Sequence, residues 1–384
     1  MNEIEQLFFE LIRVAIGTQV TLSPGLRAGL SRLPSEAEWE ELFEMAVKQS
    51  LVGICFCGLH DFGADSDAPS LRQAHGKLDS GQEETFVRIG MSENLYFNWI
   101  GMAAQINMRN EMMNGYTKDA LAFFRKKDIP CQVLKGQGVA KLYGNLRGFR
   151  QSGDIDAWLK ISRKELYALS QRELGKVEGI TYHHIHFPII ADCEVEAHLH
   201  PSFLSSPRRN KALKKFCAIH EPKEGCEDTP SLAFNRVYIL LHCYRHFCGH
   251  GIGMRQLLDY YFVLRQGFTE AEKAESMKWI SALGMKRFAM ATMWLMKEIL
   301  GLEDKYLLCE TEEKKGRFLL EEVMRSGNFG HGNYGSRISG TAVKRYLYNI
   351  KRDIRTVKIC PHESLWDPMF NIYQFLMTKF VWNK

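Results

Sequence analysis

Residues 131–159 read CQVLKGQGVAKLYGNLRGFRQSGDIDAWL, and this stretch ends in two carboxylates around one apolar residue. Successive side chains of a strand point to opposite faces, so Asp154 and Asp156 share one face while Ile155 points into a core. Adjacent carboxylates repel each other unless a cation lies between them. Because Mg²⁺ binds one or two carboxylates together with substrate phosphates, the stretch predicts a divalent-cation site.

The beginning of the same stretch predicts a place for an anion. The apolar run at residues 131–134 indicates a short strand, and the small residues of Lys135-Gly136-Gln137-Gly138 indicate a turn into a helix. Backbone amides at such a turn and the first amides of a helix can face a phosphate, and Lys135 can add a positive charge. We expect a helix at residues 138–143 and a polar loop at residues 144–152.

A third carboxylate, Glu196, occurs in a second strand-like run at residues 193–200, which follows another at residues 181–190. Residues 162–174 have the pattern of a helix. This alternation of strands and helices predicts a small α/β core with a mixed sheet. Glu196 then has two readings, as a metal ligand or as a cross-strand partner in an ion pair.

The flanks of this core read as helical, so the fold class is α+β. We expect a helical N-terminal region at 1–127, an α/β core at 128–205 and a helical C-terminal region at 206–384. Polar stretches at 61–84 and 326–340 predict connections between helices. A basic helix is expected at 341–358, either contacting RNA or packing Tyr346, Leu347, Ile350 and Ile354 inward with its charges in solvent.

The composition of the 384 residues excludes some classes of protein. The formal net charge of +5 is mild and by itself does not indicate nucleic-acid binding. Apolar runs are too short for a membrane span, and the N-terminus lacks the pattern of a signal peptide. The ten cysteines are scattered among apolar residues, which is typical of reduced thiols in a cytoplasmic protein.

The motifs together resemble the nucleotidyltransferase superfamily that includes DNA polymerase beta, and more closely its branch of uncharacterised nucleotidyltransferases. The matching elements are Leu134-Lys135-Gly136, Leu142-Tyr143, Arg150, Asp154-Ile155-Asp156, Glu196-Ala197-His198 and Arg255-Gln256-Leu257-Leu258-Asp259. The resemblance covers residues 90–270 and the flanks more loosely. Lys-Gly replaces the Gly-Ser or Gly-Gly of better-known members, and the spacing to Asp154 is longer than in the smallest members.

The resemblance implies transfer of a nucleoside monophosphate from an NTP to a hydroxyl-bearing acceptor, which is a small molecule, a protein or RNA. Asp154, Asp156 and Glu196 would be the catalytic residues and the ligands of Mg²⁺ or Mn²⁺. The residues expected to bind the nucleotide phosphates are Lys135, Gly136, Gln137, Gly138, Arg150, Ser152 and His198. Arg150 has a second reading, as a loop arginine paired with a surface acid. Lys135 also has one, as a plain exposed lysine of the turn.

Other functions stay open at this point. The same fold could bind a nucleotide without turnover, or act as an interaction module of the toxin–antitoxin kind. His242 and His246 are spaced four apart on an apolar helix, which is more typical of core histidines than of zinc ligands. Pairs at His184/His186 and His198/His200 could face each other across paired strands, either around a metal or as a polar wall.

Overall fold

The computed structural model describes residues 1–18, 34–63, 89–249, 251–328, 342–377 and 379–380. The predicted connections at 61–84 and 326–340 lie largely outside these ranges. Within them, α1 (Glu3–Ala15), α3 (Glu36–Gln49) and α4 (Val52–Gly63) form the N-terminal helices. A capping box opens α3 at Ser35, where the Glu38 carboxylate accepts from the backbone amide of Ser35 at 2.7 Å.

A four-stranded mixed sheet forms the centre of the protein and confirms the expected α+β class. Its order is β1 (Cys131–Val133), β2 (Ile155–Leu159), β4 (Val195–His198) and β3 (His184–His186). The β2 and β4 strands are parallel, whereas β1 and β3 pair antiparallel at the two edges. The strands β3 and β4 are shorter than the sequence runs that predicted them.

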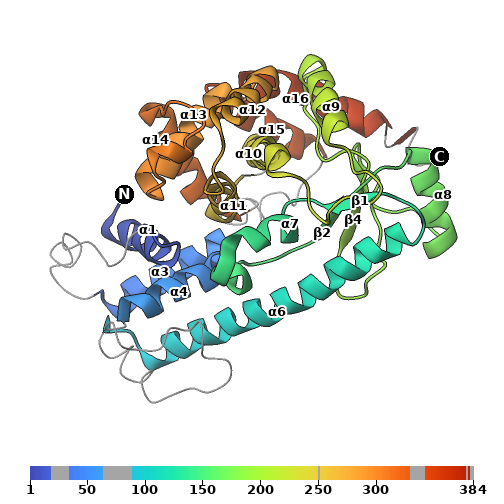
Figure 1. Cartoon of the computed structure of the whole chain (residues 1–384). Coiled ribbons are helices and arrows are strands. Elements are labelled where there is room, and N and C mark those ends of the chain that lie inside the picture. Colours follow the sequence, from blue (N-terminus) through green and yellow to red (C-terminus); the bar gives the residue numbers. More distant parts are fainter. Residues whose placement is uncertain (19–33, 64–88, 250, 329–341, 378, 381–384) are drawn as a thin grey trace.

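One face of this sheet is covered by two helices, α6 (Glu93–Arg125) and α8 (Arg163–Leu174). The apolar side chains that alternate along the strands, such as Ile155 and Ala157, are fully buried against them. Figure 1 shows the long α6 running along the sheet. Because this face is entirely apolar, the polar side chains of the same strands must point to the other face.

The segment between β1 and β2 differs from the expected helix and loop. It contains the four-residue α7 (Gln137–Ala140) and then turns of 3₁₀ helix at Lys141–Phe149. Gly144 interrupts these turns with φ 56° and ψ −125°, a conformation that favours glycine. The predicted helix at 138–143 is present, as α7 followed by 3₁₀ turns up to the break at Gly144, whereas the predicted loop at 144–152 is helical up to Phe149.

The C-terminal region is helical, as expected. Its elements are α9 (Pro207–His220), α10 (Leu232–Cys248), α11 (Met254–Leu264), α12 (Glu270–Ala282), α13 (Lys286–Trp294), a π-helical turn (Leu295–Ile299), a 3₁₀ turn (Asp304–Tyr306), α14 (Glu313–Ser326), α15 (Ala342–Thr356) and α16 (Pro361–Met377). No helix in the described ranges has the length and apolar character needed to cross a bilayer.

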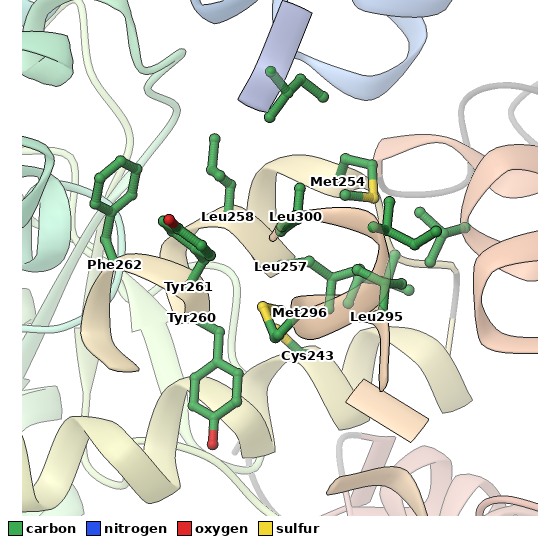
Figure 2. Packing of buried hydrophobic residues seen from close by; sticks show 14 of the residues in the cluster. Cys243, Met254, Leu257, Leu258, Tyr260, Tyr261, Phe262, Leu295, Met296 and Leu300 are labelled. Carbon is green, nitrogen blue, oxygen red and sulfur yellow. The ribbon is translucent and has the colours of Figure 1, made fainter. Parts of the chain in front are cut away.

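The largest cluster of buried side chains surrounds α11, in which every residue is buried. Figure 2 shows part of this packing, with Met254, Leu257, Leu258, Tyr260, Tyr261 and Phe262 of α11 against Cys243, Leu295, Met296 and Leu300. A helix that is buried on all sides lies inside a core rather than at a surface. Side chains of all three expected regions join this cluster, and the region boundaries stay a prediction.

The basic helix α15 is turned differently from the expectation. Leu347 and Ile354 are 59% and 70% exposed, so the predicted inward packing of these two residues is wrong. Asp353 and Thr356 are the buried residues of this part of α15, so Ile354 faces outward. The half-buried Arg352 donates to the carbonyl oxygen of Phe247 at the end of α10, and the exposed Arg355 donates to Glu322 at 2.7 Å.

Candidate active site

The predicted carboxylates lie together on the polar face of the sheet. In the parallel pairing of β2 with β4, Asp156 lies directly opposite Glu196, and Asp154 immediately precedes β2. Trp158, one pleat further along β2, stacks on Phe234 of α10 with ring centroids 5.1 Å apart. The site therefore lies on the sheet face that α10 partly covers, opposite to α6 and α8.

Lys135 reaches these carboxylates from the end of β1. Its Nζ lies 2.6 Å from Asp156 Oδ2 and 3.4 Å from Asp154 Oδ2. Burial by itself would lower the pKa of Lys135, but the charges of Asp156 and Asp154 outweigh it and raise the pKa above its usual value. Lys135 is therefore a cation inside the carboxylate cluster rather than a plain turn lysine.

His198 is the second cation of the cluster. Its Nε2 lies 2.8 Å from Asp156 Oδ1 and 3.0 Å from Glu196 Oε2, while its Nδ1 lies 3.3 Å from the carbonyl oxygen of His200. Burial disfavours the charged ring, yet the hydrogen bonds to the two carboxylates raise the pKa of His198 to about 9. The imidazolium thus holds Asp156 and Glu196 in fixed orientations.

The three carboxylates differ in environment. Asp156 is 1% exposed, and although burial opposes its charge, Lys135 and His198 hold its pKa well below the usual value. Burial and the nearby Asp156 raise the pKa of Glu196. The side chain of Asp154 is 36% exposed and lies where the cluster opens to solvent.

This donor set fits a divalent cation. Carboxylate oxygens are the preferred ligands of Mg²⁺. One donor atom each from Asp156, Glu196 and His198 lies within 4.8 Å of the other two. The oxygens of Asp156 are buried, and each lies against one cation, Oδ2 against Lys135 and Oδ1 against His198. The charge now supplied by Lys135 and His198 is the charge that a bound cation would supply.

The turn after β1 has the glycines that its geometry requires. Gly136 has φ 49° and ψ −118°, and a Cβ on Gly138 would lie 2.5 Å from the carbonyl oxygen of Val133. The Gly138 amide closes the turn by donating to Lys135 at 2.6 Å, and the buried Gln137 side chain donates to Asn114 of α6 at 2.8 Å. These bonds fix the turn, and its predicted phosphate contact stays a prediction.

Arg150 has a buried partner that the sequence analysis did not identify. Its Nε and Nη2 each lie 2.7 Å from the Asp259 carboxylate of α11, which also accepts from Tyr143 at 2.6 Å. Arg150 is 4% exposed, so this pair anchors the loop before β2 to α11. The expected phosphate contact of Arg150 stays a prediction; Arg150 does pair with an acid, but this acid is buried and is not the surface carboxylate of its second reading.

Ser152 lies between this anchor and Asp154, and its hydroxyl is buried with no hydrogen-bond partner in the described part of the chain. A buried hydroxyl without a partner is costly unless a ligand or water supplies one. Of the residues expected to contact phosphate, Lys135 and His198 are the ones whose polar atoms contact the carboxylate cluster directly.

The histidines of β3 also belong to this face. His184 lies opposite His198 and His186 lies opposite Glu196 in the antiparallel pairing. Burial and the nearby His198 lower the pKa of His184 to about 3, so this ring is neutral. The expected facing of the two histidine pairs is confirmed for His184 and His198. Among the described residues, neither His242 nor His246 belongs to a group of side chains able to hold a metal.

A comparison with protein families assigns the chain. A family model described as uncharacterised nucleotidyltransferase matches residues 35–301, which is more than half of the sequence. The chain belongs to this family. The matched range contains the whole sheet, Lys135, the three carboxylates and Asp259, so the family expected from the motifs is confirmed. No curated protein and no solved structure matches the chain.

Proposed function

We propose that this nucleotidyltransferase moves a nucleoside monophosphate from an NTP to a hydroxyl-bearing acceptor, using Mg²⁺ or Mn²⁺ held by Asp154, Asp156 and Glu196. The observation that carries the proposal is the strand register that places Asp156 opposite Glu196, with Asp154 at the open end of the same face. Three carboxylates from two adjacent strands supply the oxygen donors that a hard cation requires. The bound cation would polarise the phosphoryl group and lower the pKa of the acceptor hydroxyl. The hydroxyl oxygen would bond to the α-phosphorus as the bond from this phosphorus to the bridging oxygen breaks and pyrophosphate leaves.

The chain's own residues prepare the site in two ways. His198 and Lys135 fix the carboxylates before any ligand binds, because their ion pairs to Asp156 measure 2.8 and 2.6 Å. Lys135 and the unpartnered hydroxyl of Ser152 then offer a charge and a donor to the phosphates of the NTP.

The remaining residues expected at the phosphates act by positioning. Gln137 and Arg150 are already bonded to Asn114 and Asp259, so they hold the turn and the loop in place. Gly136 and Gly138 allow the tight turn that brings Lys135 to the carboxylates.

The experiment is incubation of the full chain with Mg²⁺ and each α-labelled NTP, alone, with RNA and with a metabolite extract. We expect transfer of label to one acceptor. The rate of transfer should fall by orders of magnitude in Asp154→Asn and Asp156→Asn, because the cation's stabilisation of the transition state is worth several kcal/mol and each 1.4 kcal/mol is a tenfold change in rate. The matched control is Asp192→Asn, which removes an exposed carboxylate just before β4.

The outcomes separate this activity from the alternatives. Unchanged transfer in either site variant would rule out the mechanism. Thermal stabilisation by Mg²⁺ and NTP without transfer to any acceptor would identify a nucleotide-binding module. A stoichiometric protein or RNA that co-purifies with the inactive chain would favour an interaction module of the toxin–antitoxin kind.

We also propose a cytoplasmic location. All ten cysteines lie in the described part of the chain, and none of them forms a disulfide bond. This many cysteines without disulfides is typical of reducing compartments. Measurement of stability with and without an oxidant tests this location. A protein adapted to an oxidising compartment would gain stability in the oxidant, whereas this chain is expected to lose stability.

A further inference from the structure

Two imidazoles and one carboxylate converge on the β3–β4 edge of the sheet. His184 and His186 are two residues apart on β3, so both point to the face that carries Glu196. The ring centroids of His184 and His186 lie 5.9 Å apart, and those of His184 and His198 lie 4.9 Å apart. The metal-dependent transfer proposed above uses neither β3 histidine.

The donor atoms of this group have the spacing of a metal site. One atom each from His184, His186 and Glu196 lies within 4.8 Å of the other two, and His184 Nδ1 lies 3.2 Å from Glu196 Oε2. Two donors at about 2.0 Å from one ion and at the tetrahedral angle would be about 3.3 Å apart. The Nδ1 atom of His184 is buried and has no hydrogen-bond partner among the described residues.

The surroundings of His186 hold its ring in place. Gly179, with φ +57°, lies directly against the ring, and a Cβ there would be 2.2 Å from Cγ of His186. The backbone amide of His186 donates to Glu178 at 3.0 Å, and Nδ1 of the ring lies 3.2 Å from Glu194 Oε1. A carboxylate beside a metal-binding imidazole is the usual partner that orients the ring.

We propose that His184, His186 and Glu196 bind one first-row transition-metal ion, of which Zn²⁺ and Co²⁺ are the test cases. Imidazole nitrogens suit these ions, whereas Mg²⁺ is bound through oxygens, so this site and the Asp154–Asp156 pair select different metals. The two share Glu196. The ion would fix the Glu196 carboxylate and leave a coordination position for water or for an acceptor group.

Cobalt binding to the full chain tests this site directly. After removal of metals with a chelator, we expect one Co²⁺ per chain in equilibrium dialysis, with the visible absorption of a four- or five-coordinate ion. His186→Asn is the main variant, because the side chain is 43% exposed and its loss leaves the core intact. We expect His186→Asn and His184→Asn to weaken Co²⁺ binding by about tenfold or more, with folding checked by thermal melts.

Two controls make the result specific. His200→Asn removes an imidazole that belongs to none of the metal-capable groups of the described residues and should leave Co²⁺ affinity unchanged. Asp154→Asn should also keep Co²⁺ binding while it abolishes Mg²⁺-dependent transfer. This last variant separates the two proposals, because Co²⁺ binding that survives the loss of transfer assigns the ion to the imidazole site rather than to Asp154 and Asp156. A wild-type chain that bound Co²⁺ but transferred no label would count against the proposed function alone.

Three results would overturn the proposal. The first is absence of Co²⁺ binding by the wild-type chain. The second is a folded His186→Asn variant that binds Co²⁺ as tightly as the wild type. The third is a spectrum dominated by thiolate-to-cobalt charge transfer, which would assign the bound ion to cysteines instead.

Discussion

Asp156 keeps a negative charge at a position that is 1% exposed, and it does so because two cations are built around it. The ion pairs to Lys135 and His198 measure 2.6 and 2.8 Å. Removal of one partner from a buried ion pair leaves an uncompensated charge and costs far more than the pair itself contributes. The stability of the metal-free protein should therefore depend strongly on Lys135.

Lys135→Met tests this dependence. We expect the free energy of unfolding of the chelator-treated protein to fall by about 3 kcal/mol. Mg²⁺ should restore part of this loss, because the divalent cation replaces the missing positive charge beside Asp154 and Asp156. Urea denaturation with and without Mg²⁺ measures both effects.

The matched control is Lys127→Met, which removes the 2.9 Å ion pair from the turn after α6 to Glu173 of α8. This pair is partly exposed, so we expect a loss of less than about 1 kcal/mol and no response to Mg²⁺. A Lys135→Met variant that behaved like Lys127→Met would show that Lys135 does not balance the charge of the carboxylates.

At the scale of elements, the loop before β2 is fastened to α11 by a contact that spans 109 residues of sequence. Arg150 meets Asp259 through two 2.7 Å contacts, and each side chain is 4% exposed. Arg255 of the same helix donates to the carbonyl oxygen of Gln151 at 2.7 Å. The position of Asp154 thus depends on a helix of the C-terminal region.

Arg150→Met should destabilise the protein by about 3–5 kcal/mol, because Asp259 would be left as a buried charge. The double variant Arg150→Met/Asp259→Leu should recover most of this loss, since no charge is then left unpaired. Urea denaturation of the two single variants and the double variant gives the coupling energy. A stable Arg150→Met variant with only a raised KM for NTP would instead assign Arg150 to the phosphates.

The helix α15 contains a carboxylate whose protonation should change stability with pH. Burial, aided by the neighbouring Asp367, raises the pKa of Asp353 to about 7, against about 3.9 in an unfolded chain. Between these values the folded state holds a proton that the unfolded state has lost. Stability therefore falls as pH rises from about 4 to 7 and levels off above it.

Asp353→Asn should remove this dependence. At pH 8 we expect the variant to be more stable than the wild type by at least about 1 kcal/mol, and below about pH 4 the difference should vanish. Thermal melts across this range measure it, with the exposed Asp192→Asn as a control that shows no such trend. Equal stability of the variant and the wild type at pH 8 would contradict the assigned pKa.

At the scale of the whole molecule, features set by local sequence patterns could be predicted, whereas contacts between residues far apart in the sequence could not. The alternation of residues along two strands was sufficient to place Asp156 and Glu196 on one face, because a strand repeats every two residues. The sequence also indicated the family and the helical flanks. It did not show that Asp259 would hold Arg150, or that Leu347 would be exposed, since both depend on which distant helices pack together.

A crystal structure of the full chain with Mn²⁺ and an NTP analogue that cannot be cleaved at the α-phosphate tests the central claim most directly. We predict anomalous manganese density bound by Asp154, Asp156 and Glu196 at about 2.1–2.2 Å. The triphosphate should lie beside Lys135 and Ser152. Manganese density away from these carboxylates, with the triphosphate bound elsewhere on the chain, would contradict the account.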